Sequence, residues 1–141
     1  MAYATIVQRS RALFIDSVWW TVILLFVPLG PAGDEIPSSP DELAVSIILS
    51  LYVAQCVPIL ITGVLWAVWR TSPGKRVLRL QIVDADSGAP MSTKQAVLRT
   101  VGYLLTFATF GAGFAWALFN TRRQALHDRL ANTVVVTDAR V

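Results

Sequence analysis

Cysteine and histidine are almost absent from this chain of 141 residues. The single cysteine, Cys56, lies within an apolar block, so an intrachain disulfide is excluded and a small buried thiol is expected. The single histidine, His127, has no companions with which to form a histidine-based metal site. We therefore expect neither a disulfide framework nor a metal centre.

The chain also lacks the residue patterns of common catalytic and nucleic-acid sites. It contains no nucleophile–base pair, no dinucleotide-binding loop and no basic face interleaved with aromatic residues. Gly74 followed by Lys75 resembles the end of a phosphate-binding loop, but the first glycine and the final Ser or Thr are missing. We expect no enzymatic activity, no cofactor and no nucleic-acid partner.

Charge is scarce as well, at 15% of residues against 55% hydrophobic residues. The apolar residues are gathered into long blocks, which is typical of a multi-pass, all-α membrane protein. Residues 1–141 leave room for one domain.

Two blocks are long enough to cross a bilayer. The first covers about residues 12–29, roughly 27 Å as a helix, and contains the carboxylate of Asp16. The second covers residues 43–69, roughly 40 Å, and predicts tilt or a kink at Pro58. An acid in mid-membrane costs about 2.5–3.5 kcal/mol, so Asp16 should face protein or water.

Residues 70–99 look like a cytoplasmic segment. A turn at 71–75 precedes an alternating strand at 77–84, and Ser92 begins a helix that runs through Arg99. We expect lipid headgroups to be contacted by an aromatic and basic group of residues: Trp66, Trp69, Arg70, Lys75 and Arg76.

Residues 100–119 form a third apolar segment with two possible courses. Small residues four apart, Gly111/Ala115 and Gly113/Ala117, suit a straight helix that crosses once. A re-entrant hairpin bent at the glycines would instead keep all 12 basic residues on one side, which the distribution of charge favours.

Residues 120–141 are expected to be cytoplasmic. A capping pattern at Thr121 and Gln124 predicts a helix over Arg122–Ala131, followed by a strand at 133–137. That strand and the strand at 77–84 should form a small two-stranded element.

Basic residues flank the spans on one side only. Arg9 and Arg11 precede the first span and six basic residues lie within 70–99, whereas the loop 30–42 is acidic and has none. The N-terminus is therefore predicted to be cytoplasmic, and the C-terminus too if the third segment returns.

Several of these features together resemble the RDD family of small bacterial membrane proteins. They are Arg9 with Asp16, the Thr71–Lys75 turn, Arg99, and the segment from Arg123 to Val135. The resemblance implies a bacterial inner-membrane location, with Asp128, or alternatively Asp84, as the second aspartate of the family name. Cation/proton exchange is proposed for some members. The short interval between Arg99 and Arg122 departs from members that fit two further spans there.

Asp16 is the candidate centre of any site. Arg9 lies on nearly the same helix face but roughly 10 Å away along the axis, so a partner from another segment is expected. The candidates are Arg99, Arg122, Arg123 and His127. We favour a structural ion pair that fixes helix registry, and the alternative is an ion or proton site.

His127 and Asp128 are adjacent and do not face each other on a helix. A hydrogen-bonded structural histidine is therefore preferred to a pH-sensitive switch.

The sequence leaves two functions open. The first is a non-catalytic accessory or structural subunit, in contact with membrane lipids, that assembles with other membrane proteins or with itself. The second is a cation/proton antiporter, or another ion-translocating component, in which Asp16 is alternately protonated and cation-bound.

Overall fold

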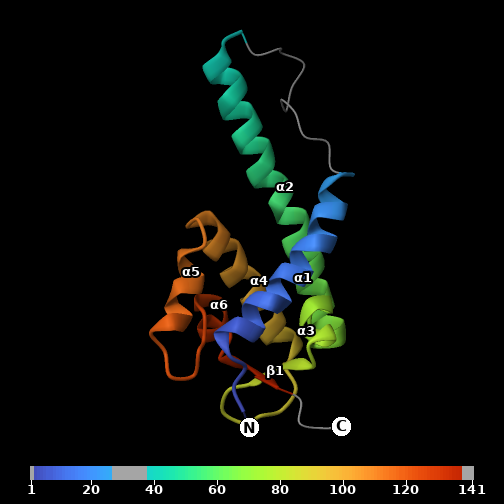
Figure 1. Ribbon diagram of the computed structural model, residues 1–141, viewed down its shortest axis with the longest axis vertical. Helices are drawn as coiled ribbons and strands as arrows, with labels where there is room; N and C mark the ends of the chain where they lie inside the picture. The colour runs from blue at the N-terminus through green and yellow to red at the C-terminus, as the bar shows by residue number, and fades with distance from the viewer. Residues whose placement is uncertain (1, 27–37, 138–141) are drawn as a thin grey trace.

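The structure is a computed structural model that describes residues 2–26 and 38–137. A small sheet and short helices form a base, from which three longer helices rise (Figure 1). The elements in chain order are α1 (Ile6–Leu24), α2 (Pro40–Trp69), α3 (Pro73–Val77), β1 (Leu80–Asp84), α4 (Thr93–Ala108), α5 (Ala112–Ala115), the 3-10 helix η1 (Trp116–Leu118), α6 (Leu126–Leu130) and β2 (Thr133–Thr137).

Helix α1 begins six residues before the predicted first span. The Thr5 side chain accepts from the Gln8 backbone while the Gln8 side chain accepts from the Thr5 backbone, a capping box that starts the helix at Ile6. Arg9 and Arg11 are therefore part of the helix. The end of the predicted span, residues 27–29, lies outside the described residues.

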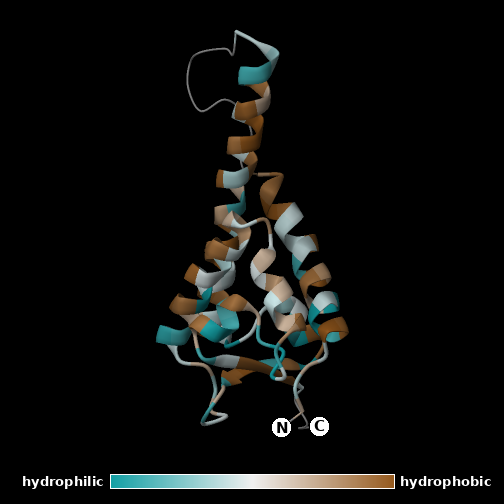
Figure 2. Cartoon of the chain, turned by 90° about the vertical axis from the view of Figure 1, so that its left-hand side faces the viewer, coloured by the Kyte–Doolittle hydropathy of each residue, from teal (hydrophilic) through white to brown (hydrophobic). Residues whose placement is uncertain are grey.

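Helix α2 is, within the described residues, the one helix that is long and apolar enough to cross a bilayer alone. Ser39 caps it, and it runs for 30 residues to Trp69, roughly 45 Å. Two full spans are not confirmed, because α1 carries three charged side chains. The upper part of α2 extends beyond the other helices, and its shaft is largely hydrophobic (Figure 2).

Strands β1 and β2 form the predicted two-stranded element. They pair antiparallel, with Leu80 opposite Thr137 and Asp84 opposite Thr133. The prediction that β1 starts at residue 77 is wrong, because Val77 ends α3 and Arg79 has a φ of 53° that turns the chain into the strand.

The third apolar segment is bent rather than straight. Ser92 caps α4 with Gln95 as predicted, and the helix continues to Ala108. The chain then turns by 112° into α5 and η1 at Gly111, whose φ of 83° suits glycine. The straight single helix is therefore wrong, while the position of this hairpin in a membrane remains a prediction.

Helix α6 is shorter than predicted. The capping pattern expected at Thr121 and Gln124 does not form, because Gln124 is buried and its Nε2 donates to the Thr133 carbonyl at 3.0 Å. Arg123 has a φ of 51°, which interrupts the expected helix, and α6 begins only at Leu126.

The core lies where α1, α2 and α4 meet above the sheet. Trp20 and Trp66 pack edge-on against Tyr103, with ring centroids 6.1 and 5.3 Å away. The Trp20 indole donates to Thr62 of α2 at 3.1 Å. Cys56, expected to be buried, is exposed on α2 instead.

The third apolar segment is bent, and β1 pairs with β2. We therefore predict that the start of α4 and the turn at residues 119–125 lie on the same side of the membrane. In a Cys56→Ser background, single cysteines at the exposed positions Lys94 and Arg122 should react with an impermeant maleimide from one face of membrane vesicles. A cysteine at Asp41 should react only from the other face. Labelling of the first two positions from opposite faces would contradict the hairpin.

Candidate functional site

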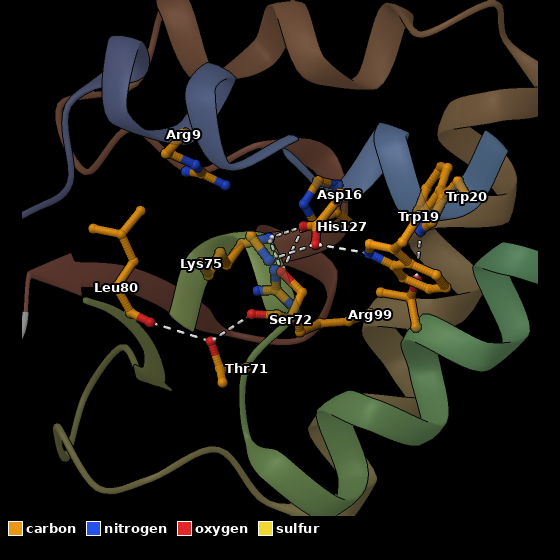
Figure 3. A network of polar contacts seen from close by, with 12 residues as sticks. Arg9, Asp16, Trp19, Trp20, Thr71, Ser72, Lys75, Leu80, Arg99 and His127 are labelled. Atoms are coloured by element: carbon orange, nitrogen blue, oxygen red, sulfur yellow. Dashed lines mark hydrogen bonds and ion pairs between the residues drawn. The ribbon is translucent and has the colours of Figure 1, made fainter. Parts of the chain in front are cut away.

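The Asp16 carboxylate is held by the segment that follows α2. It accepts from the Ser72 hydroxyl at 2.6 Å and from the Gly74 backbone N–H at 2.7 Å, and from the Trp19 indole at 3.2 Å. The Lys75 ammonium lies 3.9 Å from the same carboxylate (Figure 3). With Asp16 only 2% exposed, its charge is compensated entirely inside the protein.

The local sequence of α3 explains this docking. Pro73 starts the helix at a position that needs no N–H donor, and the Ser72 hydroxyl is free of a capping role and reaches Asp16. A Cβ at Gly74 would lie 2.1 Å from the Ala12 carbonyl oxygen, so only glycine lets α3 approach α1 this closely.

The expected partners of Asp16 are therefore wrong. Arg99 pairs with another carboxylate, and Arg122 lies at the surface 4.0 Å from Asp86. The close approach of α3 to α1 places the Ser72 hydroxyl and the Gly74 backbone N–H beside Asp16. These donors, rather than a guanidinium, therefore satisfy the carboxylate.

The second carboxylate, Asp128, joins the two ends of the chain. One of its oxygens pairs with Arg99 of α4, and the other pairs with Arg9 of α1. The Ala125 backbone N–H donates to Asp128 at 3.0 Å and so caps α6. The same Arg99 nitrogen donates to the Thr133 hydroxyl of β2, so four elements meet at one buried group. Asp84, the other candidate aspartate, lies outside this network and accepts from Ser87 and Gln95.

Asp128 and its neighbour His127 both have pKa values below those of isolated side chains. Burial alone would raise the pKa of Asp128, but the guanidiniums of Arg99 and Arg9 outweigh it and hold the pKa well below its usual range. Burial lowers the pKa of His127 well below 6.5, against the opposing effect of Asp128. His127 is thus neutral at physiological pH, and its ring packs 4.6 Å from Tyr103.

Trp66 lies between the two carboxylate sites. The Arg99 guanidinium lies 4.7 Å from its ring centroid and the Lys75 ammonium 5.9 Å, both within cation–π range. Trp66 is 1% exposed, so its predicted place at the lipid interface is wrong. Lys75 is buried too, so the prediction that it contacts lipid headgroups is also wrong.

The remaining predicted interface residues stay at the surface. Trp69 is 48% exposed, and the Arg76 guanidinium lies 5.5 Å from its ring. Arg70 is exposed and donates to the Met91 carbonyl. Arg123 contributes a backbone carbonyl that accepts from Arg9, rather than a charge.

The arrangement can clamp helices together but offers little to a ligand at either carboxylate. Both carboxylates are saturated by donors, and no metal-binding group of three or more His, Cys, Asp or Glu side chains occurs in residues 2–26 and 38–137. Sequence reasoning missed Ser72, Gly74 and Thr133. The Ser-Pro-Gly-Lys turn was the available signal for the first two, because a helix-starting proline beside glycine predicts a tight approach.

Asp128→Asn should lower the free energy of unfolding by about 3–5 kcal/mol, because it leaves the buried guanidinium of Arg99 and the partly buried one of Arg9 without a countercharge. Unfolding titrations in neutral-detergent micelles measure this. Asp86→Asn is the matched control, since it removes a carboxylate that pairs with Arg122 at the exposed surface, and should cost no more than about 0.5 kcal/mol. Equal effects of the two variants would show that burial does not set the energy of the Asp128 pairs.

Lys75 gives the folded protein a distinctive pH dependence. Burial lowers the pKa of Lys75 from 10.5 to about 8, although the Asp16 carboxylate acts in the opposite direction. Between these values the unfolded chain keeps a proton that the folded chain has released, so this group makes stability rise with pH.

Relative to Lys75→Met, the free energy of unfolding should therefore increase by up to about 1.4 kcal/mol per pH unit through that window. Parallel pH series of both proteins in the same micelles measure the difference. If the difference in unfolding free energy between the two proteins stayed constant from pH 8 to 10.5, Lys75 would be solvated in the folded protein as it is in the unfolded chain.

Comparison with known proteins supplies the family. The RDD family model matches residues 3–132. An uncharacterized protein of Rickettsia prowazekii (strain Madrid E) is 39% identical over 71 residues, which are 50% of this chain and 39% of that protein. A proline-rich antigen homolog of Mycobacterium tuberculosis (strain H37Rv) is 30% identical over 66 residues, 47% of this chain and 28% of that protein.

The matched part of this chain thus spans well under half the length of either relative. No solved structure matches the chain. Because the family model extends over nearly all of the sequence, the chain belongs to the RDD family.

Proposed function

We propose that this RDD protein is a non-catalytic subunit of a larger or homo-oligomeric assembly in the bacterial inner membrane. The observation that carries the proposal is the upper half of α2, whose apolar side chains are exposed around the helix. They are Leu43, Val45, Ile47, Ile48, Leu49, Leu51 and Val53. A helix that is apolar on all sides needs lipid or protein around it.

A groove beside this helix adds to the apolar surface. It measures about 760 Å³ and separates α2 from the α4–α5 hairpin. Its walls include Tyr52 and Ile59 on one side and Leu104, Phe107 and Phe114 on the other. A groove of this size suits the side chains of a further transmembrane helix, so it supports assembly within the membrane.

The ionic network supports a structural role for the base. Asp128 ties α1, α4 and α6 together, and Asp16 ties α1 to α3. Breaking a buried pair is strongly destabilising, so these contacts hold the base rigid beneath the exposed helix. A rigid base fixes the direction in which α2 meets its partner.

Exchange of cations for protons at Asp16 is the alternative. Such a site must release its donors and reach water in each cycle. Asp16 instead has two short hydrogen bonds to Ser72 and Gly74 and almost no exposed surface, which argues against repeated opening. The geometry therefore favours the subunit role.

The oligomeric state tests the proposal. Native mass measurement after gentle detergent extraction should give a homo-oligomer or a complex of fixed stoichiometry. Paired leucine-to-serine changes at Leu49 and Leu51 should dissociate it, while the same change at the distant exposed residue Leu130 should not. A monomer that carries only lipid under these conditions would contradict the assembly role.

Asp16→Asn tests the alternative directly. On the structural account, everted vesicles containing this variant should exchange protons for cations at the same rate as vesicles containing the unchanged protein. Asp86→Asn serves as the surface control. An exchange activity that is present in the unchanged protein and abolished only by Asp16→Asn would favour the transport role.

A further inference from the structure

A second cavity lies beside the ionic network, between α1 and the segment that follows the hairpin. This crevice measures about 220 Å³ and has a mainly apolar lining into which polar side chains from several elements project. Arg9 and Ser10 come from α1, Lys75 from α3, Tyr103 from α4 and His127 from α6. Figure 3 places Arg9, Lys75 and His127 around the same region. Three nitrogen-bearing side chains thus face one small space.

The charges around this crevice do not cancel. Counted over the described residues of the network, three buried or nearly buried cations, Arg9, Lys75 and Arg99, accompany two carboxylates, Asp16 and Asp128. Each cation is paired, but Arg9 and Arg99 share Asp128, so with His127 neutral the five charged groups carry a net charge of +1. An uncompensated charge in a poorly solvated place is costly, so an anion would be stabilised there.

Hydrogen-bonding capacity is also left over. The Lys75 ammonium has three N–H donors, and its contacts are the Ser72 hydroxyl at 3.2 Å and Asp16 at 3.9 Å. Among the described residues that line the crevice, the buried His127 Nδ1 atom has no hydrogen-bond partner. Buried polar atoms are normally satisfied, so unpartnered ones indicate a missing ligand or water.

We propose that the crevice binds the phosphate group of an anionic molecule, with Lys75 and Arg9 as its charged contacts. The volume of about 220 Å³ admits a phosphate group and leaves space beside it. Ile6, Leu13 and Phe114 form apolar walls beside the polar lining. Such walls suit the first carbons of a phospholipid, whereas inorganic phosphate would use the polar lining alone. This inference concerns a binding site and does not depend on the subunit role.

Thermal unfolding of the full-length protein in neutral-detergent micelles tests the site. One arm adds sodium phosphate against sodium chloride of equal ionic strength. The other adds phosphatidylglycerol against phosphatidylcholine, which carries the same phosphodiester without net charge. Stabilisation by phosphate and by phosphatidylglycerol would identify a general phosphate site. Stabilisation by phosphatidylglycerol alone would identify a lipid headgroup site.

Two variants tie any stabilisation to the crevice. Lys75→Gln should weaken binding by about tenfold or more, because a charge-assisted hydrogen bond is lost. Arg76→Gln is the matched control, since Arg76 neighbours Lys75 but is exposed, and it should bind normally. Ala117→Leu should narrow the crevice without replacing a charged group and should also abolish binding.

Ala117→Leu keeps the test decisive if Lys75→Gln does not fold. The proposal is overturned if neither ligand stabilises the unchanged protein. It is equally overturned if Ala117→Leu binds as well as the unchanged protein, or if Arg76→Gln weakens binding as much as Lys75→Gln does.

Discussion

The structure depends on two buried carboxylates, Asp16 and Asp128, whose hydrogen-bond donors lie far from them in the sequence. Asp128 receives guanidinium groups from Arg9, 119 residues away, and from Arg99. Asp16 receives a hydroxyl and a backbone N–H from the turn at residues 72–74, more than fifty residues away. A buried charge without such donors would be prohibitively costly, so folding must bring these segments together.

This constraint separates the molecule into two parts with different roles. The base, in which α1, α3, α4, α6 and the sheet meet, is held by directional contacts that tolerate few alternative arrangements. The upper part of α2 presents apolar side chains outward. A rigid ionic base with an apolar extension is suited to holding a position in an assembly, whereas moving an ion would require the base to open.

The sequence predicted the features that depend on neighbouring residues. Ser92 begins α4 and residues 133–137 form a strand, because capping and alternation are local. The partners of Asp16 were not predictable, because they depend on Gly74, which has no side chain and so lets α3 lie against α1. Trp66 was misplaced for a similar reason. Its place near Arg70 in the sequence suits a lipid interface. In the structure, α4 packs against α2 and places Arg99 over the Trp66 ring instead.

A double-mutant cycle between Arg9 and Asp128 would test this account most directly. The cycle compares the free energies of unfolding of Arg9→Met, Asp128→Asn, the double variant and the unchanged protein in the same micelles. Because the two groups share one buried contact, we predict a coupling free energy of at least about 1.5 kcal/mol. Strictly additive effects, with no coupling between the two positions, would contradict the claim that this buried ion pair holds the two ends of the chain together.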